Sequence, residues 1–118
     1  MWCGFVLESQ ESGRIYFAGD TAFGDHFNSI KDKINTIRAS ILPIGAYEAR
    51  WFMKPVHMNP DDAVRASLIL ASKVNIPVHY GVFALSDEGQ DDPIHILRGI
   101  RGSSGFHILD FGEGLWLK

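Results

Sequence analysis

The stretch Ala39-Ser40-Ile41-Leu42-Pro43-Ile44-Gly45 decides the fold of this chain. It is almost wholly apolar, which is typical of a strand that is covered on both faces of a sheet. The segment from Ala46 to Met58 follows directly, is rich in Trp, Phe, Met and His, and has no clean period, so we interpret it as a loop. In open α/β sheets ligands collect where strands end, so this loop is a candidate region for function.

Further apolar runs and helical patterns lie on both sides of this strand. Their order, β-β-α-β-α-β-α-β-β, predicts a layered α/β protein. Asp25 and Asn59 are the predicted N-caps of the first two helices, and Pro60 is the first residue of the second. The predicted strands are Phe5–Leu7, Ile15–Ala18, Ala39–Gly45, Ile76–Tyr80, Phe106–Leu109 and Leu115–Leu117, and the helices run from Asp25 to Ile37, from Pro60 to about Lys73, and from Asp92 to Gly102.

Composition limits the classes of protein that the chain can belong to. It has 118 residues, 46% of them apolar and 21% charged, which fits one globular domain. The formal charge of −3 argues against a nucleic-acid-binding protein that works by bulk charge. No apolar run approaches the ~18 residues of a membrane span, and we see no signal peptide. Cys3 is the single cysteine, so an internal disulfide is excluded and we expect a cytoplasmic protein.

Two polar residues stand at the ends of apolar strands. Asp20 follows the strand Ile15–Ala18, and His79 lies in the strand Ile76–Tyr80. A carboxylate and an imidazole that project from neighbouring strand ends can form part of a zinc site. The other interpretation is that the aspartate forms a turn and the histidine is buried in the core. Considered by themselves, these two residues favour this second interpretation.

The loop after the central strand holds a third candidate, His57. It is either a buried loop histidine or a functional group, because a loop this rich in large apolar side chains either packs on a partner layer or lines a pocket. Glu48, Arg50 and Lys54 of the same loop can bind an anionic substrate, although the residues themselves favour an exposed, salt-bridged face.

Three motifs together resemble a known family. They are Phe17-Ala18-Gly19-Asp20-Thr21, then Leu42-Pro43-Ile44-Gly45-Ala46-Tyr47-Glu48-Ala49-Arg50-Trp51-Phe52-Met53-Lys54 followed by His57, and His79-Tyr80-Gly81-Val82-Phe83-Ala84-Leu85. They closely resemble the C-terminal half of the metallo-β-lactamase-fold hydrolases. The nearest branch is the N-acyl-phosphatidylethanolamine-hydrolysing phospholipase D with its bacterial RomA-like relatives, and UlaG-like lactonases are more distant.

This resemblance implies a fold and a site. The fold is α/β, half of the αβ/βα sandwich: a mixed β-sheet with helices on one face. The resemblance implies two zinc ions, with Asp20 bridging them, His79 as a ligand of the second, and His57 as a catalytic contact to the phosphodiester or its leaving group. The nucleophile implied is a metal-bound hydroxide, because two cations lower the pKa of water and stabilise the charge on the phosphate.

The chain also departs from the family. The family's His-x-His-x-Asp-His motif is absent from residues 1–118. We therefore interpret residues 1–118 as the C-terminal half of a metallo-β-lactamase-like domain, inactive alone, whose parent hydrolyses phosphodiesters of a lipid-like kind or lactones. A non-catalytic association module or a degenerate gene product is the alternative. The expected partner is the missing N-terminal half or a second copy in a homodimer, because otherwise an apolar face of the sheet meets water.

Overall fold

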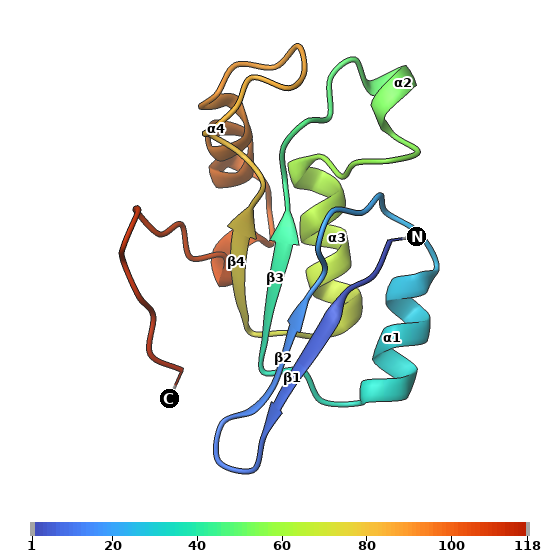
Figure 1. The fold of residues 1–118 in the computed structure, drawn as a ribbon, viewed down its shortest axis with the longest axis vertical. Helices are drawn as coiled ribbons and strands as arrows, with labels where there is room; N and C mark the ends of the chain where they lie inside the picture. Colours follow the sequence, from blue (N-terminus) through green and yellow to red (C-terminus); the bar gives the residue numbers. More distant parts are fainter. Residues whose placement is uncertain (1, 118) are drawn as a thin grey trace.

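Four strands form a mixed sheet in the order β1-β2-β3-β4 in the computed structural model, which describes residues 2–117 (Figure 1). β1 (Phe5–Ser9) and β2 (Gly13–Phe17) form the predicted antiparallel hairpin. β3 (Ala39–Pro43) and β4 (Val74–Val78) follow in parallel with β2. Because β2, β3 and β4 run in the same direction, the loops that follow them emerge at one end of the sheet, where the carboxyl ends of these strands lie. We call this end the carboxyl edge of the sheet.

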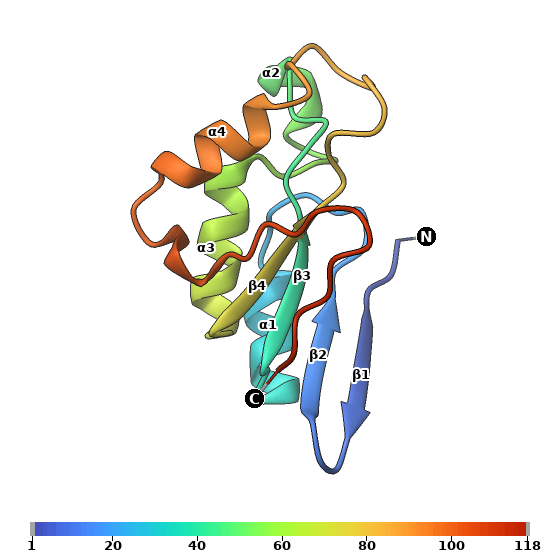
Figure 2. The same ribbon diagram turned by 90° about the vertical axis from the view of Figure 1, so that its left-hand side faces the viewer.

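Helices cover one face of this sheet (Figure 2). They are α1 (His26–Ile34), α3 (Pro60–Leu70) and α4 (Asp92–Gly99), while the short α2 (Arg50–Met53) stands above the sheet edge and the 3₁₀ turn η1 (Ser103–Gly105) follows α4. The predicted arrangement, a mixed sheet with helices on one face, is therefore confirmed. No helix within residues 2–117 combines the length and the apolar character that crossing a membrane requires.

The predicted start of α3 is confirmed. The Asn59 side chain accepts a hydrogen bond from the Asp62 N–H at 2.9 Å, and Pro60 occupies the first turn. The helix ends at Leu70 rather than near Lys73, because Ala71 takes a left-handed conformation with φ of 52°. Asp25 occupies the predicted N-cap position of α1, although its side chain makes no capping bond, and the helix ends at Ile34 rather than at Ile37.

The two strands predicted after α4 are wrong. Phe106 forms a single bridge with Asn75, and the segment from His107 to Leu117 has no regular structure. The reason lies in β4, where the Asn75 carbonyl accepts from the His107 N–H at 2.8 Å and so faces the outer edge. The N–H and C=O groups of successive residues in a strand point to opposite sides, so those of Pro77 point to the same side as those of Asn75. Proline has no N–H to donate, so a further strand cannot continue its pairing with β4 past this residue.

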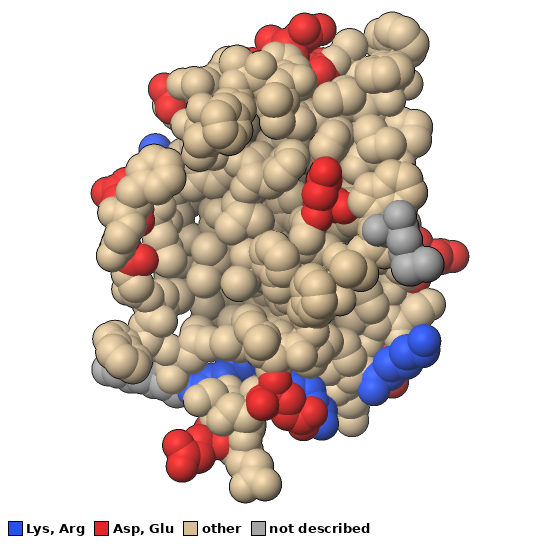
Figure 3. All heavy atoms as spheres, viewed as in Figure 1, with Lys and Arg blue, Asp and Glu red and all other residues tan. Residues whose placement is uncertain are grey.

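The face opposite the helices is apolar. The strand register aligns two rows of side chains across it, Phe5-Phe17-Ile41-Ile76 and Leu7-Ile15-Ala39-Val74. Phe5 and Leu7 are 58% and 61% exposed. Figure 3 views this face and shows a largely uncharged surface, with Lys, Arg, Asp and Glu gathered mainly at its borders. The face opposite the helices is therefore apolar, and no helix of residues 2–117 covers it.

Candidate metal centre

Asp20 reaches the carboxyl edge of the sheet through a glycine turn. The Ala18 N–H still donates to the Ile41 carbonyl at 3.0 Å, which extends the pairing of β2 with β3 by one residue. Gly19 then adopts a φ of 70°, and a Cβ at this position would lie 2.9 Å from the Cys3 carbonyl oxygen. This turn suits glycine because a side chain would be both strained and crowded, and it leaves the Asp20 carboxylate 46% exposed.

His57 ends the loop that follows β3. Its N–H donates to the Met53 carbonyl at 2.8 Å, which closes the turn after α2. Its carbonyl accepts from Arg50 Nη1 at 3.0 Å, and the same guanidinium forms an ion pair with Asp62 of α3. Met58, the next residue, is fully buried in the core. The main chain at His57 is therefore fixed on both sides, with the imidazole 17% exposed.

His79 is the first residue after β4. It has a φ of 64°, which is uncommon for a residue with a side chain, so the chain turns sharply as the strand ends. Its imidazole remains 29% exposed. The Val78 carbonyl accepts from the Ile44 N–H at 3.0 Å, which keeps the ends of β3 and β4 together.

The three candidate residues meet at this edge, as predicted from their places in the sequence. His57 Nδ1 lies 2.8 Å from Asp20 Oδ1, and His79 Nε2 lies 3.9 Å from Asp20 Oδ2. The two imidazole rings stack with 5.4 Å between their centroids. One donor atom from each residue lies within 4.8 Å of the other two, a spacing at which they can hold a common metal ion. The metal-ligand and catalytic roles themselves stay predictions.

The donor set fits a divalent cation in a further respect. His57 Nδ1 is buried and makes no hydrogen bond with any described residue, although Asp20 Oδ1 lies only 2.8 Å away. A buried polar atom without a partner is uncommon. Converging carboxylate oxygen and imidazole nitrogen atoms suit zinc, which is bound by these two kinds of ligand.

Two further acidic residues build the site, and the sequence did not identify them. Asp62 pairs with Arg50, so the predicted salt bridge forms, but the pair is largely buried and not part of an exposed face. Glu88 accepts hydrogen bonds from the backbone N–H groups of three consecutive residues, Ala46, Tyr47 and Glu48. The sequence carries no local signal for this contact, because the partners lie about 40 residues apart.

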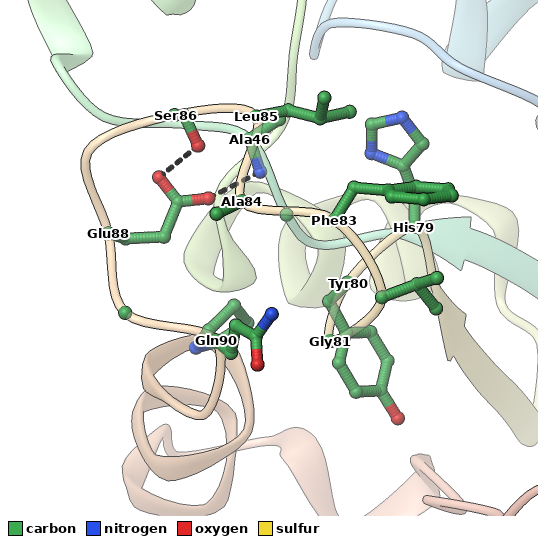
Figure 4. A pocket seen from close by; sticks show the side chains of 14 residues that line it. Ala46, His79, Tyr80, Gly81, Phe83, Ala84, Leu85, Ser86, Glu88 and Gln90 are labelled. Carbon is green, nitrogen blue, oxygen red and sulfur yellow. Dashed lines mark hydrogen bonds between the residues drawn. The ribbon is translucent and has the colours of Figure 1, made fainter.

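A pocket of about 260 Å³ opens beside His79. Its walls come mainly from the segment after β4, including Tyr80, Val82, Phe83 and Leu85 (Figure 4). The Glu88 carboxylate stands at the far side of the pocket, bonded to Ser86 and Ala46. The pocket is thus mostly apolar and adjoins the imidazole of a candidate metal ligand.

Comparison with known proteins agrees with the fold described above. Residues 1–80 match the family described as the beta-lactamase superfamily domain. The chain is 40% identical over 86 residues to N-acyl-phosphatidylethanolamine-hydrolyzing phospholipase D 1 of Caenorhabditis elegans, an alignment that covers 72% of this chain and 24% of that protein. It is 31% identical over 110 residues to the metal-dependent hydrolase lin1612 of Listeria innocua, covering 93% of this chain and 43% of that protein. The chain therefore spans less than half the length of either relative.

Solved structures share the fold. The isothiocyanate hydrolase from Delia radicum gut bacteria superposes with a TM-score of 0.72 at 19% identity, covering 94% of this chain and 42% of that one. The metallo hydrolase Igni18 of Ignicoccus hospitalis superposes with a TM-score of 0.67 at 21% identity, covering 93% and 43%. From the family match over residues 1–80, together with this fold, we conclude that the chain belongs to the metallo-β-lactamase superfamily of hydrolases.

Proposed function

We propose that this chain is part of a zinc-dependent phosphodiesterase of the phospholipase D kind, in which Asp20 and His79 bind metal and His57 contacts the substrate. The observation that carries the proposal is the convergence of the three side chains within 4.8 Å at the carboxyl ends of the parallel strands. Ligands of open α/β sheets bind at this edge. A metal bound there would lower the pKa of water and stabilise the charge that develops on a phosphate group.

The chain's own residues have separate tasks in this proposal. Asp20 offers two carboxylate oxygens, one facing each histidine, so it can bind two metal ions at once. His79 supplies an imidazole at the mouth of the apolar pocket. The imidazole of His57, held by its main chain, orients the phosphodiester and can hold a proton near the leaving-group oxygen.

Two observations support a lipid-like phosphodiester as the substrate. The Caenorhabditis elegans relative, 40% identical over its aligned part, is named for hydrolysis of N-acyl-phosphatidylethanolamine. The pocket beside His79 has mostly apolar walls and can take an alkyl portion of such a substrate. A lactone is the alternative substrate of the intact enzyme.

The intact centre needs more ligands than these. Asp20 and His79 offer fewer donors than two zinc ions require, because each zinc ion takes about four. We propose that a second segment, the N-terminal half of the parent domain or a second polypeptide, completes the centre. This chain alone then has no turnover. A role as an association module is the second candidate function, and the uncovered apolar face of the sheet favours it.

Calorimetric titration with zinc tests the proposal. The chain is expected to bind zinc, and Asp20→Ala and His79→Ala each weaken binding by about tenfold or more. Asp32→Ala and His95→Ala remove exposed residues of the same types from α1 and α4, and are expected to change nothing. Equal affinities in all five proteins would overturn the metal site. Zinc-dependent hydrolysis of bis(p-nitrophenyl) phosphate by this chain alone would overturn the need for a second segment.

A further inference from the structure

The loop after β3 and the segment after β4 are joined by one carboxylate. Glu88 Oε1 accepts from the N–H groups of Ala46 at 2.5 Å and Tyr47 at 3.2 Å, and Glu88 Oε2 accepts from the Glu48 N–H at 3.0 Å. The Ser86 hydroxyl donates to the same Oε2 at 2.5 Å. Four donors thus converge on one side chain, and hydrogen bonds to an ionised acceptor are about twice as strong as neutral ones.

The two segments that this carboxylate joins are those that carry the histidines. The segment after β4 begins with His79 and reaches Glu88 after it has lined the pocket (Figure 4). The loop after β3 begins with Ile44, passes through the three N–H groups bound by Glu88, and ends at His57. Glu88 therefore fixes the start of the loop whose far end presents the imidazole of His57.

A second contact fixes the same pair of segments at their base. A Cβ at Gly45 would overlap the His79 carbonyl oxygen, so the two main chains already touch there. Glu88 adds a contact one to three residues further along the loop, and the Asp87 N–H donates back to the Glu48 carbonyl at 3.3 Å. Two contacts at separate points prevent the loop from pivoting about one of them.

Between Glu48 and His57 a different set of hydrogen bonds holds the loop in place. Ala49, two residues after Tyr47, is the N-cap of α2, and its carbonyl accepts from the Phe52 and Met53 N–H groups at 3.0 Å. Arg50 follows, and it binds both the His57 carbonyl and Asp62 of α3. The chain from Glu88 to His57 is thus hydrogen-bonded at nearly every step.

We infer that Glu88 is a positioning residue, which locks the loop after β3 to the segment after β4 and so sets the distance between the imidazoles of His57 and His79. The effect on metal binding rests on the proposed metal centre, whereas the attachment of the loop by Glu88 can be observed without metal. Burial opposes ionisation of this carboxyl group, but hydrogen bonds from Ser86 and from backbone N–H groups outweigh it and lower its pKa. The carboxylate is therefore charged at neutral pH.

The test compares Glu88→Gln with Glu113→Gln. Glu113 is the control, because it also accepts a backbone N–H, that of Asp110 at 2.8 Å, but on the C-terminal segment and not on the loop after β3. Three readouts are taken: amide hydrogen exchange at residues 46–48, the imidazole NMR signals of His57 and His79, and the affinity for Co²⁺ with its visible spectrum. Thermal unfolding shows whether each variant folds.

In Glu88→Gln we expect about tenfold faster exchange at residues 46–48, shifted or broadened imidazole signals of His57, and about tenfold weaker Co²⁺ binding with an altered visible band. The imidazole signals of His95, on α4, stay as in the wild type. Glu113→Gln is expected to match the wild type throughout. Should Glu88→Gln fail to fold, Glu88→Asp keeps the charge but shortens the reach, and the same changes are expected in smaller degree.

Two outcomes would count against the account in different ways. Faster exchange at residues 46–48 with unchanged His57 signals would overturn the positioning role and leave Glu88 as a local structural contact. Absence of Co²⁺ binding in the wild type would overturn the proposed metal centre instead. In that case the imidazole signals of the metal-free variants still decide whether Glu88 positions His57.

Discussion

Gly45 and His79 touch through their main chains, since a Cβ on Gly45 would overlap the His79 carbonyl oxygen and approach Tyr80 Cβ to 3.1 Å. This contact lies where β3 and β4 end, directly beneath the candidate metal centre. The loop that ends at His57 and the segment that begins at His79 therefore leave the sheet from one closely packed point. Glycine is required at position 45 because the neighbouring atom is backbone and cannot rotate away.

Gly45→Ala is expected to destabilise the fold by about 2 kcal/mol and to shift the imidazole NMR signals of His79, because overpacking of a tight contact forces the backbone apart. Urea unfolding measures the first effect. Gly99→Ala is the control, because a Cβ at this helical position meets nothing within 4 Å. That variant is expected to be neutral or slightly stabilising. Equal stability of the two variants would contradict the close approach.

Arg50→Met is expected to cost about 1–3 kcal/mol, because it removes the closer of the two ion pairs of the nearly buried Asp62 carboxylate and leaves the His57 carbonyl without its donor. Arg65→Met is the matched control. Arg65 reaches the same carboxylate at 3.5 Å, but its side chain is 63% exposed, so we expect a change of less than about 0.5 kcal/mol. Similar losses in both variants, measured by urea unfolding, would show that Arg50 has no special place in the site.

The contribution of Glu88 to stability is expected to depend on pH. Its pKa in the folded chain is lowered from the ordinary value of 4.5, so the folded state favours the ionised form. The resulting stabilisation is fully present above pH 4.5 and is lost as the pH falls through the lowered pKa. Urea unfolding of the wild type and Glu88→Gln between pH 3 and 6 measures this. The difference between them should shrink toward low pH, and a difference that grows instead would contradict the assignment.

Tyr47→Phe is expected to leave stability within about 0.5 kcal/mol of the wild type or to raise it. The Tyr47 hydroxyl is buried without a hydrogen-bond partner among the described residues, so its removal loses no bond. Burial and the charges of Glu88, Asp92 and Glu48 raise the pKa of this hydroxyl to about 12, so it stays neutral in the folded chain. Thermal unfolding at pH 7 gives the comparison, and a loss above 1 kcal/mol would reveal a partner that we have not identified.

The uncovered face of the sheet is expected to drive self-association of this chain in isolation. Sedimentation at micromolar concentration should show a dimer or larger species, because Phe5, Leu7 and parts of the half-buried apolar rows behind them otherwise meet water. Leu7→Glu should shift the distribution toward monomer, whereas Leu68→Glu, at an equally exposed position on α3, should not. A wild-type monomer would contradict this part of the account.

Local patterns predicted a layered α/β protein and placed Asp20 and His79 at strand ends, and the common direction of parallel strands then brings these two residues and His57 together. The mixed sheet with helices on one face was instead implied by the family resemblance. The sequence could not predict contacts that depend on distant residues. Glu88 resembles any loop acid in the sequence, and only the folded chain brings it to the N–H groups of residues 46–48. The two final strands were wrong for a similar reason. Whether a further strand can pair with β4 depends on the side to which Pro77, which has no N–H, points in the folded sheet.

Anomalous diffraction at the zinc edge, from crystals of this chain grown with zinc, tests the central claim most directly. The account predicts a peak about 2.0–2.2 Å from an Asp20 carboxylate oxygen and a His79 nitrogen, which is lost in Asp20→Asn. His57 should lie beside this peak with its imidazole facing Asp20. A zinc ion bound only elsewhere, or a peak that persists in Asp20→Asn, would contradict the assignment of this sheet edge as the metal centre.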